Sequence, residues 1–247
     1  MKKNRLGKFL FITFVITIIA WGGLAALTKL GIIAFSHPLG TLLHILGGFG
    51  PTIATFFVME EKPTARAILK FVFQCKKTTL IYLLLLAIME ILLIGISSRE
   101  LNPALPWYFI PVVFLQAVFI YGGAEELGWR GIMQPILEKR FPFPIATLIT
   151  GVVWGLWHIP LWFIDGSSQQ NMNFVFFLIL AVILSFWLAA LYKKTKCVFA
   201  CNVFHGLTNT LLSVFVIKLN ASFVLGLIAL IAYSIYLWYK EEKDLIA

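Results

Sequence analysis

The sequence predicts an all-α, polytopic membrane protein with about eight transmembrane helices and both termini in the cytoplasm. Of the 247 residues, 60% are hydrophobic and only 13% are charged, a composition that water-soluble domains of this length do not show. The apolar residues form runs long enough to cross a bilayer, and the basic residues fall in the connections between those runs. We therefore expect a single membrane domain over residues 1–247.

The first half of the chain contains three predicted spans and the start of a fourth. Met1–Arg5 resembles the start of a signal peptide, but the apolar run after it is too long and lacks a small-residue cleavage pattern, so it predicts a first transmembrane helix. Glycines at 47, 48 and 50 before Pro51 predict a kink in the second helix. The basic segment 60–79 predicts an amphipathic helix on an anionic membrane face. The helices expected here cover residues 9–35, 41–59, 80–96 and about 107–138.

The second half of the chain is divided by turn residues and lysines. The Phe141–Pro144 stretch predicts a turn after the fourth helix, a polar loop covers 165–173, and the lysine-rich stretch 193–196 closes the sixth helix. The remaining helices are expected at 144–164, 174–192, 198–217 and 222–239.

The distribution of basic residues predicts the orientation of these helices. All but three of the 20 lysine and arginine residues lie on the side of the N-terminus, the exceptions being Lys29, Arg99 and Lys218. Because cytoplasmic loops are enriched in lysine and arginine, both termini are expected in the cytoplasm. The same distribution accounts for the net charge of +9, so we expect the lipid bilayer and no nucleic acid as a partner. Cys197 and Cys201 share a helix face, which indicates packing rather than a disulfide between them.

Two adjacent carboxylates and an arginine interrupt the apolar sequence at Glu125, Glu126 and Arg130. An ionisable group in hydrocarbon is costly, which makes this stretch a candidate functional site. Glu126 and Arg130 are four residues apart and can pair on one helix face, whereas Glu125 points away from that pair. The alternative interpretation is a charge cluster at the membrane interface.

A helical hairpin is expected to bring Glu125 close to His158. If the fourth helix continues to about Glu138 with a kink near Pro135, the two residues lie nearly equally far in sequence from the turn at Pro142. They then reach the same depth in an antiparallel pair. Trp154 lies four residues before His158, on the same face.

His205 and Asn209 share one face of the seventh predicted helix. In hydrocarbon both need polar partners, and the Glu125–His158 hairpin offers them. Each could instead make a structural hydrogen bond between helices, which is how we interpret His44; we assign no role to Glu90.

Three ordered motifs on separate predicted helices resemble those of the CPBP family, which includes the type II CAAX prenyl endopeptidases and the bacterial bacteriocin-processing or immunity (Abi) proteins. The motifs are Glu125-Glu126-x-x-x-Arg130, Trp154-x-x-x-His158 and His205-x-x-x-Asn209. The resemblance covers a core at about 107–213, and Trp154 stands where the family usually has phenylalanine.

This resemblance implies an intramembrane endopeptidase whose water-filled cavity opens toward the cytoplasm. The catalytic residues that it implies are Glu125, His158, His205 and Asn209, with Glu126, Arg130 and Trp154 in supporting positions.

The residues themselves suggest two forms of hydrolysis. With no serine placed beside a suitable base, we favour a water activated by Glu125 and oriented by His158, with His205 and Asn209 donating to the oxyanion. A zinc ion bound by Glu125, His158 and His205 is the competing mechanism. The absence of an HExxH motif favours the metal-free form.

Non-enzymatic alternatives are a transporter that uses the buried charges as a proton relay, and a catalytically idle immunity or scaffold protein. A transporter would predict repeated, broken helices, which the sequence does not show. The expected substrate of the enzyme is a membrane-associated protein or peptide precursor, and the expected location is a cell membrane, most simply a bacterial plasma membrane.

Overall fold

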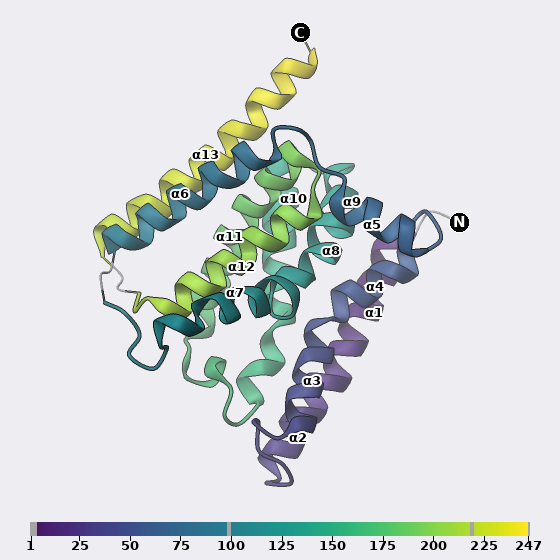
Figure 1. Cartoon of the computed structure of the whole chain (residues 1–247). Coiled ribbons are helices and arrows are strands. Elements are labelled where there is room, and N and C mark those ends of the chain that lie inside the picture. The colour runs from purple at the N-terminus through teal and green to yellow at the C-terminus, as the bar shows by residue number, and fades with distance from the viewer. Residues whose placement is uncertain (1–3, 98–99, 218–219, 247) are drawn as a thin grey trace. The chain divides into compact units, whose positions relative to one another are not determined.

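A computed structural model describes the backbone of residues 4–97, 100–217 and 220–246 (Figure 1). Its regular elements are all helical over these residues, apart from an isolated bridge between Leu101 and Phe215. This confirms the all-α prediction. Arg99 and Lys218, which entered the orientation argument, lie outside the described residues.

The elements follow the predicted order, with several helices broken into shorter pieces. They are α1 (Arg5–Thr17), the π-helical η1 (Ile18–Gly22), α2 (Gly23–Lys29), α3 (Pro38–Gly48), α4 (Gly50–Val58), α5 (Ala65–Phe73), α6 (Thr79–Ser97), the 3₁₀-helical η2 (Trp107–Phe109), α7 (Ile110–Phe119), the 3₁₀-helical η3 (Gly123–Glu125), α8 (Glu126–Gly128), the π-helical η4 (Trp129–Met133), α9 (Gln134–Glu138), α10 (Phe143–Trp157), the 3₁₀-helical η5 (Ile159–Phe163) and η6 (Ser168–Asn171), α11 (Phe174–Thr195), α12 (Val198–Val214) and α13 (Ala221–Ile246).

Six helical runs in the described chain are long and apolar enough to cross a membrane. They are Arg5–Lys29, Thr79–Ser97, Trp107–Glu138, Phe143–Phe163, Phe174–Thr195 and Ala221–Tyr239. The pair α3 and α4 adds a seventh if its 44° bend lies within one span; this bend falls at the predicted glycine-rich kink. The remaining predicted helix, α12, has 17 residues. The count of about eight spans and the cytoplasmic termini remain predictions.

The chain forms two compact units, each made of two segments. The first unit comprises Met1–Ala67 and Glu125–Val182, and the second comprises Ile68–Ala124 and Ile183–Ala247. The predicted functional residues are divided between them, since Glu125 and His158 belong to the first unit and His205 and Asn209 to the second.

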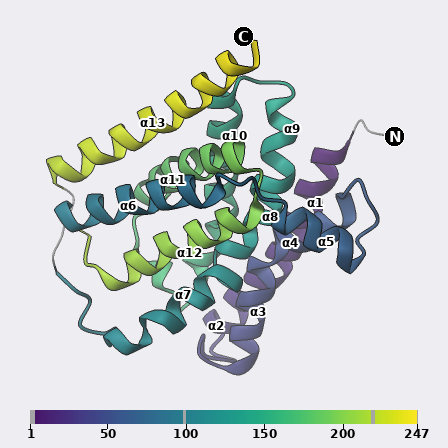
Figure 2. The same ribbon diagram turned by 45° about the horizontal axis from the view of Figure 1, so that its top comes forward.

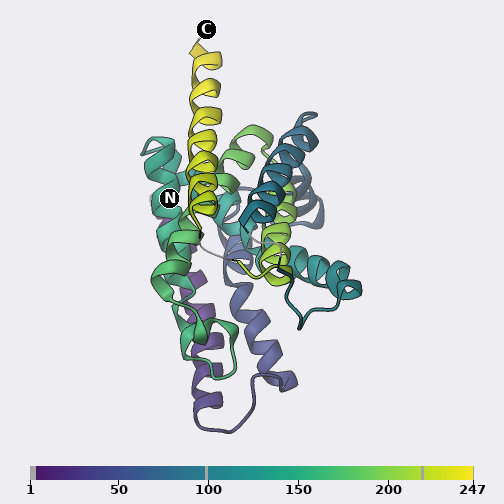
Figure 3. The same cartoon turned by 90° about the vertical axis from the view of Figure 1, so that its left-hand side faces the viewer.

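Within the first unit, α1 packs against α4 and α2 against α3 (Figure 3). Thr17 joins three segments here, because its hydroxyl donates to Gly47 O at 2.8 Å and accepts from Trp157 Nε1 at 2.8 Å. Trp21 Nε1 donates to His44 O, also at 2.8 Å. These bonds attach the N-terminal helices to the end of α10, directly before His158.

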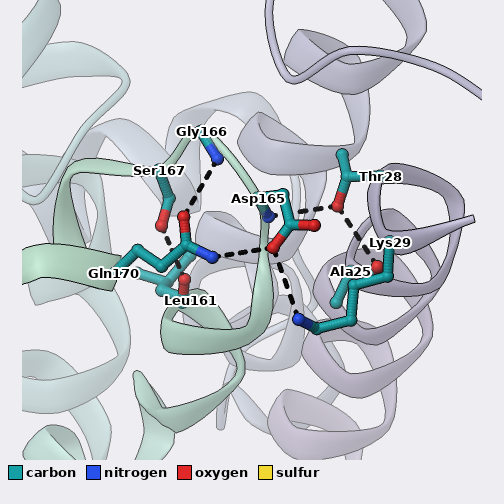
Figure 4. Close-up of polar contacts among 8 residues, drawn as sticks. All are labelled: Ala25, Thr28, Lys29, Leu161, Asp165, Gly166, Ser167 and Gln170. Atoms are coloured by element: carbon teal, nitrogen blue, oxygen red, sulfur yellow. Dashed lines mark hydrogen bonds and ion pairs between the residues drawn. The ribbon is translucent and has the colours of Figure 1, made fainter. Parts of the chain in front are cut away.

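The segment after His158 is attached to the end of α2 by a polar network (Figure 4). Asp165 Oδ1 accepts from Lys29 Nζ at 3.3 Å and from Gln170 Nε2 at 2.7 Å. The Asp165 backbone N–H donates to Thr28 Oγ1 at 3.2 Å. Both charged side chains are about half exposed, with 51% and 47% accessible. We therefore regard the network as a means of placing the loop rather than a large source of stability.

Within the second unit, α12 lies between α7 and α6, and α13 packs on α6 (Figure 2). The pair α7 and α12 approaches closely at Gly206, where an added Cβ would lie 2.9 Å from the Val118 backbone nitrogen. A larger residue at this position would therefore separate the two helices.

A disulfide between Cys75 and Cys197 joins the segment after α5 to the start of α12. Beside it, the Lys76 backbone N–H donates to Thr195 O at 3.2 Å. Cys201 remains a buried thiol whose Sγ donates to Leu188 O at 3.6 Å. Cys197 and Cys201 do not bond to each other, as expected, but the pairing of Cys197 with a cysteine 122 residues away was not predicted.

We predict that Cys201 is the one cysteine alkylated when the protein is extracted into detergent and denatured without reductant. A thiol-blocking reagent is present throughout these steps. Reduction before a second alkylation should expose Cys75 and Cys197 to the reagent. Peptide mass spectrometry measures this, with Cys201→Ser as the control that should show no alkylation before reduction. The predicted topology places Cys75 and Cys197 at the cytoplasmic face, where disulfides are rare, so this experiment tests the cross-link itself. Labelling of these two cysteines without reductant would contradict it.

Candidate active site

The fourth predicted helix is broken before its acidic motif. α7 ends at Phe119, and Gly122 then adopts a φ of +95°, a conformation that glycine reaches without steric cost. The Tyr121 carbonyl oxygen accepts a hydrogen bond from Asn209 Nδ2 at 3.2 Å. The predicted run of helix to about Glu138 is present, since Trp107–Glu138 forms one apolar run long enough to cross a membrane. The break at Gly122, where a glycine turn and the Asn209 amide satisfy the backbone, was not predicted.

The second irregularity is a π-helical turn, η4, that begins at Trp129 and contains Arg130. Within it, Arg130 Nε donates to Glu126 Oε2 at 2.9 Å, and both side chains are completely buried. The predicted pairing of these two residues is thus confirmed. Arg130 Cζ also lies 5.9 Å from the centre of the Trp154 ring, within the range of a cation–π contact.

Glu125 lies beside this ion pair, and its carboxylate faces the end of α10. The residue is 6% exposed. Its Oε2 accepts a hydrogen bond from Trp154 Nε1 at 2.7 Å and lies 4.0 Å from His158 Nε2. The expected meeting of Glu125 and His158 across the hairpin is therefore confirmed.

The end of α10 fixes the orientation of the His158 ring. In a continuing α-helix the His158 backbone N–H would bond to Trp154 O, but here it donates to Gly155 O at 3.2 Å. The Trp154 carbonyl oxygen instead lies 2.8 Å from His158 Nδ1. From this contact we assign the ring hydrogen to Nδ1, so that Nε2 of the neutral ring presents a lone pair toward Glu125.

Aromatic side chains surround the His158 ring and restrict its rotation. Besides the Trp154 ring, whose centre lies 5.7 Å away, the nearest ring centres are those of Trp157 at 4.6 Å, Phe177 at 5.1 Å and Trp21 at 5.9 Å. Their edge-to-face and tilted arrangements are favourable for aromatic pairs. Sequence reasoning missed these three residues, because Trp21 and Phe177 lie on helices without a motif and Trp157 resembles ordinary apolar sequence.

In the second unit, His205 and Asn209 both lie against Gly122. An added Cβ on Gly122 would collide with the Asn209 side-chain nitrogen and would lie 2.7 Å from His205 Nε2. His205 is 3% exposed. The predicted common face of His205 and Asn209 is thus present, and it meets the glycine turn three residues before Glu125. Gly122 is a further functional candidate, and its signal in the sequence is the Gly-Gly pair that precedes the acidic motif.

The residues of the predicted zinc alternative are divided between the two units, with Glu125 and His158 in the first and His205 in the second. Among the described residues, no group of three or more histidine, cysteine, aspartate or glutamate side chains could hold a metal ion. In addition, Trp154 bonds to Glu125 Oε2 and to His158 Nδ1. The zinc alternative therefore stays a prediction, and we route no catalytic step through a metal.

Comparison with known proteins confirms the resemblance that the motifs indicate. A family model described as type II CAAX prenyl endopeptidase Rce1-like matches residues 103–211, close to the predicted core. The chain is also 29% identical over 143 residues to CAAX prenyl protease 2 of Methanococcus maripaludis, in an alignment that covers 54% of this chain and 51% of that protein. The chain thus spans about half the length of the curated relative that it matches.

We predict that Arg130→Ala destabilises the folded protein by about 3–5 kcal/mol, because it leaves the buried Glu126 carboxylate without its cation. The double variant Glu126→Gln, Arg130→Gln should recover most of the folded protein, since two amides can bond to each other without a buried charge. Thermal unfolding in detergent and membrane abundance measure both effects. If the single and the double variants lose equal stability, the two residues do not depend on each other.

Proposed function

We propose that this chain is an intramembrane endopeptidase that hydrolyses a peptide bond of a membrane-associated protein or peptide precursor through a water activated by Glu125. The observation that carries the proposal is the 4.0 Å approach of Glu125 Oε2 to His158 Nε2 in a buried site. It lies inside the region that matches the endopeptidase family model. The similar Methanococcus protein is named a protease, which supports the same class of activity.

The proposed nucleophile is a water that donates one hydrogen to Glu125 and the other to His158 Nε2. Two acceptors 4.0 Å apart can both be reached by one water at about 2.8 Å from each. Glu125 takes the proton as the water oxygen attacks the peptide carbonyl carbon. As the tetrahedral intermediate collapses, the C–N bond breaks and Glu125 returns the proton to the leaving amine.

We further propose that His205 and Asn209 donate hydrogen bonds to the oxyanion of that intermediate. One N–H of Asn209 bonds to Tyr121 O, and an amide has a second N–H to give. Covalent geometry supports a role for these residues beside Glu125: Gly122, against which both lie, is three residues from Glu125. The Cα atoms of Gly122 and Glu125 can therefore lie at most about 11 Å apart.

The supporting residues Glu126, Arg130 and Trp154 keep Glu125 in place in this mechanism. Glu126 is neutralised by Arg130, and Trp154 holds both the Glu125 carboxylate and the His158 ring. The adjacent acids thus receive different roles, one structural and one chemical. The proposed location is a cell membrane, and the name of the similar Methanococcus protein places prenylated proteins among the substrates to be tested.

We predict that Glu125→Ala and His158→Ala each abolish cleavage while the protein still accumulates in the membrane. Turnover is measured on a library of quenched peptides, prenylated peptides included, with detergent-purified protein. His37→Asn is the matched control: this exposed histidine accepts from the Leu39 backbone N–H at a helix start, a role that asparagine also performs. Near-wild-type turnover in either alanine variant would refute the assignment of the water-activating pair.

We also predict that Asn209→Ala lowers turnover on the order of 10²–10³-fold with little change in KM, as expected for the loss of an oxyanion donor. Asn173→Ala is the control, because the side chain of this exposed residue accepts from the Phe176 backbone N–H at the start of α11. A rise in KM with unchanged kcat would instead assign Asn209 to substrate binding.

A further inference from the structure

Glu90 is a buried acid that neither half of the candidate site uses. It lies in the apolar helix α6 and is 2% exposed. Its side chain shares a hydrogen bond with Thr208 of α12, the helix that carries His205 and Asn209. Its Oε2 has no hydrogen-bond partner among the described residues, so the contact with Thr208 is what anchors this carboxyl group.

The Thr208 hydroxyl also donates to Phe204 O at 3.2 Å. A hydroxyl has one hydrogen and two acceptor positions. A neutral glutamic acid satisfies both contacts at once, because its own O–H donates to Thr208 Oγ1 while the hydroxyl hydrogen stays on Phe204 O. A glutamine amide at position 90 could make the same donation, and a leucine could not.

The position of Thr208 makes this contact relevant to the candidate site. Thr208 directly precedes Asn209 and follows His205 by three residues, so all three lie within two successive turns of α12. Because each residue turns a helix by 100°, a fixed Thr208 also fixes the directions of its two neighbours. On its other side α12 is held by α7, through the Asn209 bond to Tyr121 O and the close approach at Gly206.

We propose that Glu90 is a positioning residue: by bonding to Thr208 it sets the rotation of α12 so that His205 and Asn209 face Gly122. Its effect on turnover rests on the proposed endopeptidase function, whereas its effect on the placement of His205 does not. The two effects are therefore measured separately.

The first measurement follows the His205 ring by NMR of detergent-purified protein labelled with ¹⁵N-histidine, the resonance being assigned with His205→Gln. Glu90→Leu and Thr208→Val should shift the His205 signal, and Glu90→Gln should leave it in place. Thr210→Val is the matched control, since Thr210 is also buried in α12 and its hydroxyl bonds only to the backbone, at Gly206 O. This control should not move the signal.

The second measurement separates kcat from KM. Glu90→Leu and Thr208→Val should each lower kcat on the order of 10–100-fold at unchanged KM. The double variant should lower kcat no further, and Glu90→Gln should keep the wild-type kcat. If Glu90→Leu fails to fold, Thr208→Val and Glu90→Gln still give the answer.

An unmoved His205 signal in folded Thr208→Val protein would overturn the proposal. So would a Glu90→Gln variant that behaves like Glu90→Leu, because the contact would then not be what matters. If wild-type protein cleaves no peptide while the His205 signal shifts as expected in Glu90→Leu and Thr208→Val, the proposed function is refuted and the positioning role of Glu90 is supported.

Discussion

The candidate chemistry depends on Trp154, which bonds to the acid with its ring and to the histidine with its backbone. Its Nε1 donates to Glu125 and its carbonyl oxygen meets His158 Nδ1. The second contact occurs where α10 tightens at its end and the His158 N–H donates to Gly155 O instead of Trp154 O. Pro160, which has no N–H to continue the helix, follows directly. The Trp154 ring thus supplies the carboxylate with a donor that a phenylalanine at this position would lack.

The neighbouring acids show how a membrane protein can retain a chemically available carboxylate. Glu126 and Arg130 neutralise each other with both side chains fully buried, and such a pair is tolerated in an apolar environment only while both partners are present. Glu125 has indole and imidazole neighbours in place of a cation in direct contact. Glu126 thus contributes to the structure, and our proposal assigns the proton transfer to Glu125.

Local periodicity was enough to predict part of this arrangement. The pairing of Glu126 with Arg130 and the common face of His205 and Asn209 follow from four-residue spacing, and the meeting of Glu125 with His158 follows from equal distances to a proline turn. The break at Gly122 was missed because its cause is not local: Asn209, far along the chain, takes the Tyr121 carbonyl. The same holds for Trp21 beside His158 and for the Cys75–Cys197 bond, since no short-range pattern reveals which distant segments pack together.

The central claim is that Glu125, and not a metal ion, activates the attacking water. The most direct test measures zinc content and peptide turnover on the same purified sample, before and after treatment with a strong chelator. Our account predicts that turnover survives chelation and that active protein contains far less than one zinc per chain. Stoichiometric zinc that is absent from the His158 and His205 variants, together with activity that chelation abolishes and added zinc restores, would contradict it.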